Sequence, residues 1–546
     1  MARPDDLDPA QRAAVTSEAA PLCILAAAGS GKTRVLTARI AHRVATGAAD
    51  PRHVLALTFT RRAAGELRAR LGRLGVDAEV TASTFHAVAW AQLRQRAADR
   101  GERPPRLVEN PRRRLARLVG PAAGDVAAEI TWAKSRLLGP AEYEAAGRRP
   151  ALPAAEVAAA FARYQEELRR GGLLDFDDLL LACAQALEDD PPFAAAQRWR
   201  FRHLFVDEYQ DLNPAQFRLL RAWLGDNLDL TVVGDPNQAV YGWNGADPEL
   251  LHRFAEHFPT AEVVRLDTSY RCPPEVLAVA TAVLPPGRVG GASPPRPPRH
   301  GGRPAPGVPT VRGFHTEDDE ARGVARAVRL AHAPGARWSD VAVLARTNAQ
   351  LSVIEEALRR ASIPHASSVP DLREPLAWLA RTPPAVPLSS ALADVECEPL
   401  RTLGREYAAL DRSPTVEGFL GWVRTVIRSG DLAGVGDAVA LATFHRAKGL
   451  EWPVVLVVGL ERGLVPVDRG DEAEERRLLY VALTRATREL HCSWAAQRRG
   501  MPRSPSPWLA AVEQACAEQA AARDRGALDW RAHLADSRAR LAATAP

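Results

Sequence analysis

One stretch near the N-terminus decides the fold: Leu22-Cys23-Ile24-Leu25-Ala26-Ala27-Ala28-Gly29-Ser30-Gly31-Lys32-Thr33. Its first part, Leu22–Ala28, is an apolar run of strand length, which the small residues Gly29, Ser30 and Gly31 end. A helix-compatible stretch, Lys32 to Arg43, follows. Small residues between a strand and a helix let consecutive backbone N–H groups turn toward phosphate oxygens, and the helix N-terminus adds a favourable dipole. The string therefore predicts a phosphate-binding loop, with Lys32 at the terminal phosphates and Thr33 on Mg²⁺. The alternative is a small-residue turn before a surface helix, and Ala26 stands where the general pattern has its first glycine.

Two acidic residues, Asp207 and Glu208, follow a second run of buried-strand type, Leu204–Val206. A phosphate loop needs a carboxylate to hold the water shell of its metal ion. We expect Asp207 to bind Mg²⁺ through water and Glu208 to orient and deprotonate an attacking water. An acidic pair at the end of a strand is common by itself, so this prediction depends on the phosphate loop that precedes it.

The alternation of apolar strand and helix recurs along the chain, which predicts parallel sheets in an α/β fold. The further strand candidates are Val54–Phe59, Leu230–Gly234, Val341–Leu344, Val439–Thr443 and Val454–Gly459, and the helix candidates are Arg61–Leu74 and Gln350–Ser362. Other stretches differ. Residues 87–178 show helical periodicity and no strand signal, and Pro285–Pro309 predicts an irregular loop. Residues 366–437 predict a helical or irregular insert broken by prolines 383, 384 and 387, and a polar helical tail follows Arg498.

Composition excludes several classes of protein. A chain of 546 residues with 46% hydrophobic and 25% charged residues has the composition of a globular protein of three or four domains, not of a fibrous or disordered chain. The net charge of +5 is compatible with a polyanionic partner. Only three lysines occur, Lys32, Lys134 and Lys448, so each is worth locating.

The cysteines and the hydropathy indicate an intracellular protein. The six cysteines are scattered without a CxxC pair, so we predict neither a zinc framework nor a disulfide scaffold. The first eight residues are polar and acidic, unlike a signal peptide, and no apolar run approaches the ~20 residues of a membrane span. We expect a cytosolic location and no membrane partner.

Two further strings are more specific than a general phosphate loop: Val206-Asp207-Glu208-Tyr209-Gln210-Asp211 and the segment 233–243, which begins Val-Gly-Asp-Pro-Asn-Gln. They resemble motifs of the UvrD/PcrA/Rep branch of superfamily 1 (superfamily 1A) helicases, and this resemblance implies a location in the bacterial cytosol, associated with the nucleoid. Others follow in family order: Leu7–Gln11 (Q motif), Thr58–Thr60 with Ala63 and Ala64 (motif Ia), Thr84–His86 (the next DNA-contacting motif), Ser269–Arg271 (motif IV), Thr443–Glu451 (motif V) and Glu474–Ala486 (motif VI). The resemblance spans roughly residues 5–490.

The resemblance implies two RecA-like P-loop motor domains, each a parallel sheet flanked by helices, with helical insertions. Motor domain 1A would comprise residues 1–86 and 179–270, and the helical insert 1B residues 87–178. Motor domain 2A would comprise residues 271–365 and 438–498, and a 2B-like insert residues 366–437, too short for the family's full 2B module. Residues 499–546 would form a C-terminal helical tail.

The resemblance also implies the roles of residues around ATP and Mg²⁺. The phosphates would lie on Ala28, Gly29, Ser30, Gly31 and Lys32, and the metal near Thr33 and Asp207. Gln11 would hydrogen-bond the adenine edge, with Arg34 and Tyr270 on the two faces of the ring. Gln238 would sense the γ-phosphate and Glu451 would touch the ribose. Arg271 and Arg485 would act as arginine fingers from the second motor domain.

Candidate DNA contacts come from the residues and from the resemblance. Phe59, Tyr241 and Trp243 directly follow strand candidates, where rings can face a groove and stack on bases. The resemblance assigns Phe59 and Trp243 to stacking and His86 and His445 to the DNA track. Thr60 and Thr84 belong to the DNA-contacting motifs. The alternatives are rings folded into the core and structural histidines. Asn244 stands where the family has arginine, and Lys448 could pair with an acid or approach a phosphate.

We therefore predict an ATP-dependent 3′→5′ translocase on single-stranded DNA, a DNA helicase of repair or recombination. Its partners would be single-stranded DNA, tailed or forked duplex DNA and repair proteins, and it would act as a monomer or a DNA-dependent oligomer. One alternative is a translocase that strips proteins from DNA without separating strands, since the 2B-like insert is short. The other is a catalytically silent scaffold, against which the intact set of Lys32, Asp207, Glu208, Arg271 and Arg485 argues.

Overall fold

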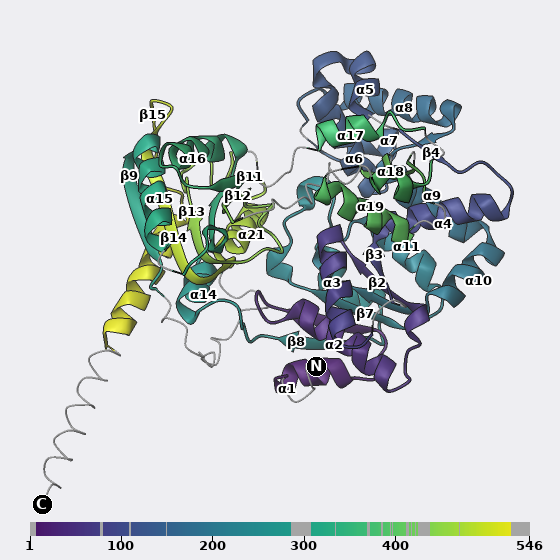
Figure 1. The fold of residues 1–546 in the computed structure, drawn as a ribbon, viewed down its shortest axis with the longest axis horizontal. Coiled ribbons are helices and arrows are strands. Elements are labelled where there is room, and N and C mark those ends of the chain that lie inside the picture. The colour runs from purple at the N-terminus through teal and green to yellow at the C-terminus, as the bar shows by residue number, and fades with distance from the viewer. Residues whose placement is uncertain are drawn as a thin grey trace, which may run out of the picture. The chain divides into compact units, whose positions relative to one another are not determined.

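The computed structural model describes most of the chain as two compact units (Figure 1). The described residues are 7–76, 80–108, 111–148, 150–285, 307–332, 335–367, 372–383, 386–393, 395, 397–410, 414–416, 418–420, 422–423, 437–468 and 470–525. Unit 1 comprises Met1–Ala26, Gly31–Leu266 and Val369–Ala433; unit 2 comprises Ala27–Ser30, Asp267–Ser368 and Gly434–Pro546. Each unit is built on its own sheet.

The sheet of unit 1 has six parallel strands in the order β3-β2-β6-β7-β1-β8. Their bounds are β1 Leu22–Ala26, β2 Val54–Thr58, β3 Thr81–Thr84, β6 His203–Val206, β7 Leu230–Gly234 and β8 Glu262–Leu266. The side chains of the central strand β2 alternate between the two faces of the sheet and pack into different cores. Leu55 and Leu57 belong to one hydrophobic cluster, while Val54 and Ala56 belong to another. Both faces are therefore covered, which is why these strands appear as unbroken apolar runs in the sequence.

Helices from two stretches of the chain cover this sheet. α1 Pro9–Thr16, α2 Lys32–Ala45 and α3 Arg61–Arg73 contribute to one core. The other core takes residues from α4 Phe85–Asp99, α9 Phe176–Asp189, α10 Pro191–Arg200 and α11 Pro214–Leu224. The three predicted elements Leu22–Ala28, Val54–Phe59 and Arg61–Leu74 are confirmed to within two residues at their ends. The strands at residues 81–84 and 262–266 were not anticipated, since each fully buries only one aliphatic residue, Ala82 in β3 and Leu266 in β8.

The segment between α4 and α9 is a helical insert with a core of its own. Its helices are α5 Pro111–Val119, α6 Ala123–Ser135, α7 Pro140–Ala145 and α8 Ala154–Gly171. The expectation that residues 87–178 contain no strand is wrong in one detail. Arg106–Leu107 (β4) pairs in parallel with Leu173–Leu174 (β5), a two-residue ladder too short to leave a periodic signal.

Residues 369–433 also pack with unit 1, although they interrupt the sequence of unit 2. Their helices α17 Arg373–Leu379, α18 Leu388–Ala393 and α19 Glu398–Leu410 surround a small core that includes Tyr407 and Trp422, and they appear green in Figure 1. The hydroxyl of Tyr407 accepts a hydrogen bond from Arg94 Nη1 on α4 at 3.0 Å. The guanidinium of Arg61, at the start of α3, lies 3.5 Å from the ring centre of Trp422. One hydrogen bond, to Tyr407, and one cation–π contact, with Trp422, thus hold this segment to helices α3 and α4.

The sheet of unit 2 follows the order β11-β12-β10-β13-β14-β15, and β9 pairs with β14. Its strands are β9 Thr310–Thr316, β10 Val341–Ala345, β11 His365–Ser367, β12 Val439–Thr443, β13 Trp452–Val457, β14 Ala486–Arg498 and β15 Met501–Pro502. All pairs are parallel except β14–β15. The helices include α14 Pro274–Thr281, α15 Glu317–Ala331, α16 Asn348–Arg360 and α21 Glu472–Leu483. Together the two sheets confirm the predicted α/β fold.

The predictions for the elements of unit 2 are confirmed in part. The strands at 341, 439 and 454 and the helix at 350 are confirmed, whereas β9, β14 and β15 were not anticipated. Most of the predicted loop Pro285–Pro309 lies outside the described residues. A helix runs over residues 509–525 of the predicted tail, and the residues beyond it are also outside the description. Within the described part of the chain, no helix is both long and apolar enough to cross a membrane.

A buried ion network ties the end of β14 to the rest of unit 2. Arg498 donates to Glu461 from Nε and Nη2, both at 2.7 Å, and to Glu320 from Nη2 at 2.6 Å. Arg498 is 7% exposed and Glu461 fully buried. Burial would lower the pKa of Arg498, but the bonds to Glu461 and the charge of Glu320 outweigh it and raise the pKa. These bonds replace the hydrogen bonds to water that the three charged side chains lose on folding.

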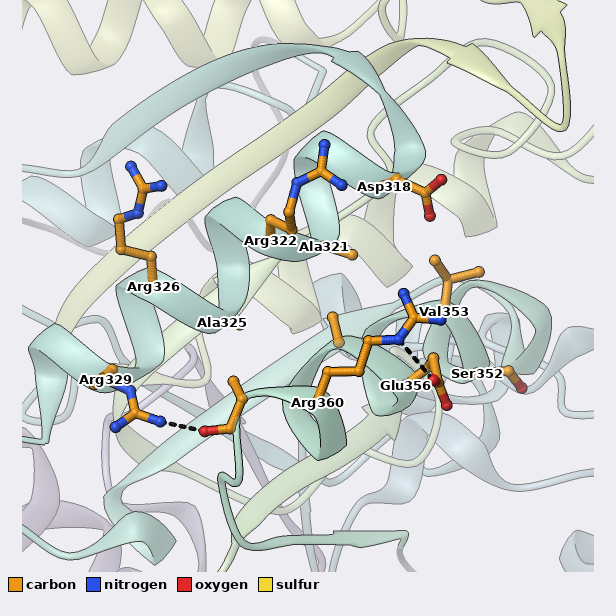
Figure 2. A pocket seen from close by; sticks show the side chains of 12 residues that line it. Asp318, Ala321, Arg322, Ala325, Arg326, Arg329, Ser352, Val353, Glu356 and Arg360 are labelled. Atoms are coloured by element: carbon orange, nitrogen blue, oxygen red, sulfur yellow. Dashed lines mark hydrogen bonds and ion pairs between the residues drawn. The ribbon is translucent and has the colours of Figure 1, made fainter.

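Unit 2 carries a groove of about 750 Å³ between α15 and α16 (Figure 2). Its floor includes Ala325, and arginines stand along its rim. Arg360 pairs with Glu356 at 2.8 Å, and Arg329 donates to the carbonyl oxygen of Ala361. Arg326 extends away from the other side chains in Figure 2. The groove is formed by small residues at helix-facing positions, and none of the predicted nucleotide or DNA residues lines it.

Candidate functional site

The predicted phosphate loop has the backbone that its function requires. β1 ends at Ala26, α2 begins at Lys32, and Gly29 and Gly31 adopt left-handed φ angles of +78° and +87°. L-residues with a side chain rarely adopt such angles, so the two glycines let the loop turn tightly in front of the helix N-terminus. Ala28 and Ser30, the other two predicted phosphate-loop residues, are fully buried. The ammonium of Lys32 lies 3.4 Å from the carbonyl oxygen of Ala26 and 3.7 Å from Asp235 Oδ2.

The predicted metal ligands are adjacent in space. Thr33 Oγ1 donates to Asp207 Oδ2 at 3.1 Å, although 174 residues separate them in the chain. A hydroxyl beside a carboxylate at the phosphate loop is the oxygen donor set that Mg²⁺ prefers. Burial, and secondarily the charge of Glu208, raises the pKa of Asp207 to about 7, and Lys32 partly opposes this. A divalent cation between Thr33 and Asp207 would supply the missing positive charge, so these residues fit a magnesium ion.

Glu208, the predicted general base, is held by a residue that sequence reasoning did not single out. Its backbone adopts a left-handed φ of +54°, unusual for a residue with a side chain. Gln210 Nε2 donates to Glu208 Oε2 at 2.5 Å, while Gln210 Oε1 accepts from the backbone N–H of Asp235 at 2.9 Å. One buried amide therefore connects the ends of β6 and β7. Its signal in the sequence was only its place in the string Asp207–Asp211.

Asp235 is the second residue that the sequence-based assignment left out. It is 1% exposed at the end of β7, and its carboxylate accepts from Gln238 Nε2 at 2.6 Å and from the N–H of Asn237 at 2.9 Å. With Lys32 at 3.7 Å, Asp235 joins the phosphate loop to Gln238, the predicted phosphate sensor. An acidic residue at a strand end, as at Asp207, was the signal that could have found it.

Two of the three predicted adenine contacts, Gln11 and Arg34, lie near the start of unit 1. Gln11 is 2% exposed and forms a capping box with Asp8, whose carboxylate accepts from the Gln11 N–H at 2.8 Å. A Cβ atom on Gly31 would lie 3.1 Å from Gln11 Nε2, so this amide already borders the phosphate loop. Arg34 is half-buried in the first turn of α2. Gln11 and the loop are therefore neighbours, as the prediction requires.

The remaining nucleotide candidates belong to unit 2. Arg271 Nε donates to Glu451 Oε2 at 2.6 Å, so the predicted finger and the predicted ribose contact are ion-paired with each other. Tyr270 is 48% exposed. Arg485 is 1% exposed and donates to the carbonyl oxygens of Val481 at 2.8 Å and Leu450 at 3.2 Å. In this conformation the guanidinium of Arg485 is engaged within its own unit.

The DNA candidates of unit 1 follow β2, β3 and β7, whose carboxyl ends share one edge of the parallel sheet. Thr60 and Thr84 are helix N-caps, which accept from the N–H groups of Ala63 and Ala87. Phe59 is half-buried, with its ring 6.2 Å from that of Phe85. Trp243 is 56% exposed and Tyr241 half-buried, with their rings 6.4 Å apart. Trp243 is thus the candidate best placed to receive a base.

The two histidine candidates are both kept neutral. The ring of His86 stacks on Phe176 at 3.8 Å with an interplanar angle of 8°, and burial lowers its pKa to about 3. Burial, together with the charges of Arg346 and Lys448, lowers the pKa of His445 to about 4. Neither ring can serve as a cation for DNA phosphates at neutral pH, so any contact with DNA would use hydrogen bonding or stacking.

Comparison with known proteins agrees with this geometry. Residues 7–259 match the UvrD/REP helicase N-terminal domain, and residues 423–497 match the UvrD-like helicase C-terminal domain. The chain is 39% identical to the ATP-dependent DNA helicase UvrD2 of Mycobacterium tuberculosis, over 92% of this chain and 81% of the relative. The chain belongs to the UvrD/REP helicase family.

Other UvrD/REP relatives match over similar lengths. DNA helicase II of Escherichia coli is 28% identical over 94% of this chain and 88% of its own length. The helicase PcrA of Leuconostoc citreum is 29% identical over 93% and 85%, respectively. The membership confirms the resemblance noted in the sequence and makes this chain a UvrD-like superfamily 1 helicase enzyme.

The buried state of His86 in this UvrD-like chain predicts a pH dependence of stability. In the unfolded chain a histidine takes up a proton below pH ~6.5, whereas folded His86 does so only near pH 3. The free energy of unfolding should therefore fall as the pH drops below 6.5, by about 1.4 kcal/mol at pH 5.5 from this residue. Urea unfolding at pH 7.5 and 5.5 measures it, and His86→Phe, which keeps the stack, should lose this part of the difference. An NMR titration of His86 with a midpoint near 6.5 would contradict the assignment.

Proposed function

We propose that this chain is an ATP-dependent 3′→5′ translocase on single-stranded DNA that acts as a DNA helicase in repair or recombination. The observation that carries the proposal is the 3.1 Å contact of Thr33 with Asp207, beside Lys32 and Glu208. The proposal is also supported by the topology: the predicted phosphate loop follows β1, Asp207 and Glu208 follow β6, and the segment that carries the exposed Trp243 comes after β7 of the same parallel sheet. The polarity and the role in repair are carried over from the family.

Each residue of unit 1 has a distinct chemical task in this proposal. Lys32 would bind the terminal phosphates as a point charge, and the loop N–H groups would hold the remaining phosphate oxygens. Bound Mg²⁺, held by Thr33 and Asp207, would neutralise charge on the phosphates. Glu208, oriented by Gln210, would accept the proton of the attacking water. Gln238, held by Asp235, would contact the terminal phosphate.

We propose that Arg271 and Arg485 of unit 2 stabilise the charge that develops on the transferring phosphoryl group. For this role Arg485 would exchange its bonds to the carbonyls of Val481 and Leu450 for the phosphate oxygens. Arg271 would likewise leave Glu451, which is then free for the ribose. Hydrolysis would thereby depend on the conformation of unit 2. Coupling between hydrolysis and this conformation would move the protein along DNA.

We expect Trp243→Ala to weaken DNA stimulation while sparing basal ATP hydrolysis. A stacked base is worth about 1–3 kcal/mol, so the oligo(dT) concentration for half-maximal stimulation should rise about 5- to 150-fold. Trp199→Ala is the matched control, because Trp199 on α10 is 65% exposed and its ring lies against His53, which precedes β2, whereas the DNA candidates follow the carboxyl ends of strands. Equal losses of basal and stimulated turnover in Trp243→Ala would instead assign its ring a structural role.

The proposed function is tested by ATP hydrolysis with and without oligo(dT), followed by strand displacement on duplexes with a 3′ or a 5′ single-stranded tail. We expect stimulation by DNA, dependence on Mg²⁺, and displacement only from the 3′-tailed substrate. Preference for the 5′ tail would contradict the polarity. A protein with no ATP hydrolysis, even with oligo(dT), would favour a DNA-binding scaffold.

A second candidate function is a translocase that strips proteins from DNA without separating strands. It is favoured by the 2B-like segment, which is short and packs through Tyr407 and Trp422 on the α3–α4 surface of unit 1. Displacement of streptavidin from a 3′-biotinylated oligonucleotide, measured beside duplex unwinding, separates the two. Robust unwinding by the monomer would remove this alternative.

A further inference from the structure

The C-terminal end of α6, which we take as Lys134 and Ser135 with the C-cap residue Arg136, contacts the loop that carries Trp243. We call residues Tyr241–Asp247 the Trp243 loop. Gly245 ends its 3-10 turn with a left-handed φ of +89°. A Cβ atom on Gly245 would lie 1.6 Å from Ser135 Oγ and 2.8 Å from Ser135 Cβ. The loop backbone therefore packs directly on Ser135, with no room for any side chain.

A second contact fixes the end of the same loop. Arg136 pairs with Asp247 at 3.3 Å, and the N–H of Asp247 donates to the carbonyl of Leu212 at 2.8 Å. Within the loop, the N–H groups of Asn244 and Ala246 both donate to the carbonyl of Tyr241. The backbone is thus held on both sides of Trp243, whose ring nevertheless stays 56% exposed.

The third residue of this C-terminal end, Lys134, anchors it to α9. Lys134 is 2% exposed, and its ammonium lies 2.6 Å from both Asp175 and Asp178. The two aspartates form the capping box that begins α9. Ion pairing with them outweighs burial and raises the pKa of Lys134, so the buried cation stays charged. One of the three lysines of the chain therefore joins the end of α6 to the start of α9.

The start of α9, which Lys134 binds, also contacts His86, a second DNA candidate. Phe176 lies between the two aspartates in sequence, and its ring stacks on His86 at 3.8 Å. The same C-terminal end of α6 therefore touches the Trp243 loop on one side and, through the start of α9, the His86 segment on the other. These two segments follow different strands, β7 and β3.

We propose that the C-terminal end of α6 is a brace that sets the position of the Trp243 loop for DNA, which makes Ser135 and Arg136 positioning residues. The helical insert would thereby control DNA engagement without touching the nucleotide. The inference rests on the proposed function, since it requires that Trp243 contacts DNA. If the brace only stabilised the fold, its disruption would lower stability and all activities together.

Gly245→Ala tests the brace at its tightest contact. The added methyl must push the loop away from Ser135, so the oligo(dT) concentration for half-maximal ATPase stimulation should rise about tenfold or more. Basal turnover and the KM for ATP should remain within about twofold of wild type. Adding Ser135→Gly removes both atoms that the methyl would meet and should restore part of the DNA response. Ser135→Gly alone is the control.

A charge swap at the partly exposed ion pair gives an independent test in variants that keep the core intact. Arg136→Glu places a negative charge against Asp247 and should weaken DNA stimulation severalfold. The double variant Arg136→Glu with Asp247→Arg restores opposite charges and should recover the wild-type response. The recovery is a result that a general loss of stability would not produce.

The outcomes separate the inference from the proposed function. A wild-type protein without DNA-stimulated hydrolysis overturns the proposed function itself. A stimulated wild type with unchanged responses in Gly245→Ala and Arg136→Glu overturns the brace alone. Equal losses of basal and DNA-stimulated turnover, without rescue in either double variant, also overturn it, because the C-terminal end of α6 is then only part of the core.

Discussion

Lys32→Ala should reduce ATP turnover by about 100- to 1,000-fold or more. In the proposed function the ammonium would be the fixed cation of the phosphate loop; Lys32 is the first residue of α2, and its ammonium lies near Asp235 and the carbonyl oxygen of Ala26. Without it the phosphates would lose their point charge while Asp235 would remain buried in the same pocket. The measurement is steady-state phosphate release with saturating oligo(dT) and Mg²⁺.

Lys32→Arg is the informative partner of this variant. It keeps the charge but replaces a compact ammonium by a planar guanidinium, which the tight loop should not accommodate, so turnover should stay low. Both variants should unfold thermally within a few degrees of wild type and bind oligo(dT) without nucleotide. Turnover above a tenth of wild type in Lys32→Ala would show that this loop is not the site of hydrolysis.

Arg498→Met should destabilise unit 2 by about 3–5 kcal/mol. Methionine fills much of the volume but leaves Glu461 and Glu320 buried without the cation that donates to both. The loss exceeds that of an ordinary surface charge because Glu461 is fully buried. Chemical denaturation of wild type and variant, compared at the transition that reports unit 2, measures the difference.

Arg326→Met is the matched control for this variant. Arg326 is exposed on α15 at the edge of the groove in Figure 2, so its replacement should change stability by less than about 0.5 kcal/mol. If Arg498→Met were no more destabilising than Arg326→Met, the buried network would carry no net stability. That result would favour water entry beside Glu461 over the closed network described above.

The central strands of both sheets could be predicted because they are buried on both faces. Val54–Thr58 and Val341–Ala345 are unbroken apolar runs, and a continuous run needs no knowledge of its neighbours. Two other strands could not be predicted. The edge strand β8 exposes much of Glu262–Leu266, and β14, which pairs with β13 and β9, mixes charged with apolar residues over 13 positions. The pairing of both is therefore decided by the finished sheet rather than by local pattern.

The candidate site shows the same division. Lys32, Thr33 and Asp207 could be predicted because their chemistry and their place at strand ends coincide, and the structure brings Thr33 and Asp207 together. Gln210 could not be assigned, since its role depends on a hydrogen bond to the end of a neighbouring strand, whereas Asp235 had a sequence signal, an acidic residue at a strand end, that was not used. The stacking of His86 on Phe176 joins residues 90 positions apart, a contact that no local pattern encodes.

Because each unit is assembled from several separated stretches, neither can be obtained as one uninterrupted fragment of the gene product. A polypeptide that stops at Leu266 would lack residues 369–433, so Arg94 would lose the Tyr407 hydroxyl and Arg61 the Trp422 ring. Dissecting the protein would therefore require rejoining distant pieces with short artificial connections. Simple truncations would confuse lost activity with lost packing.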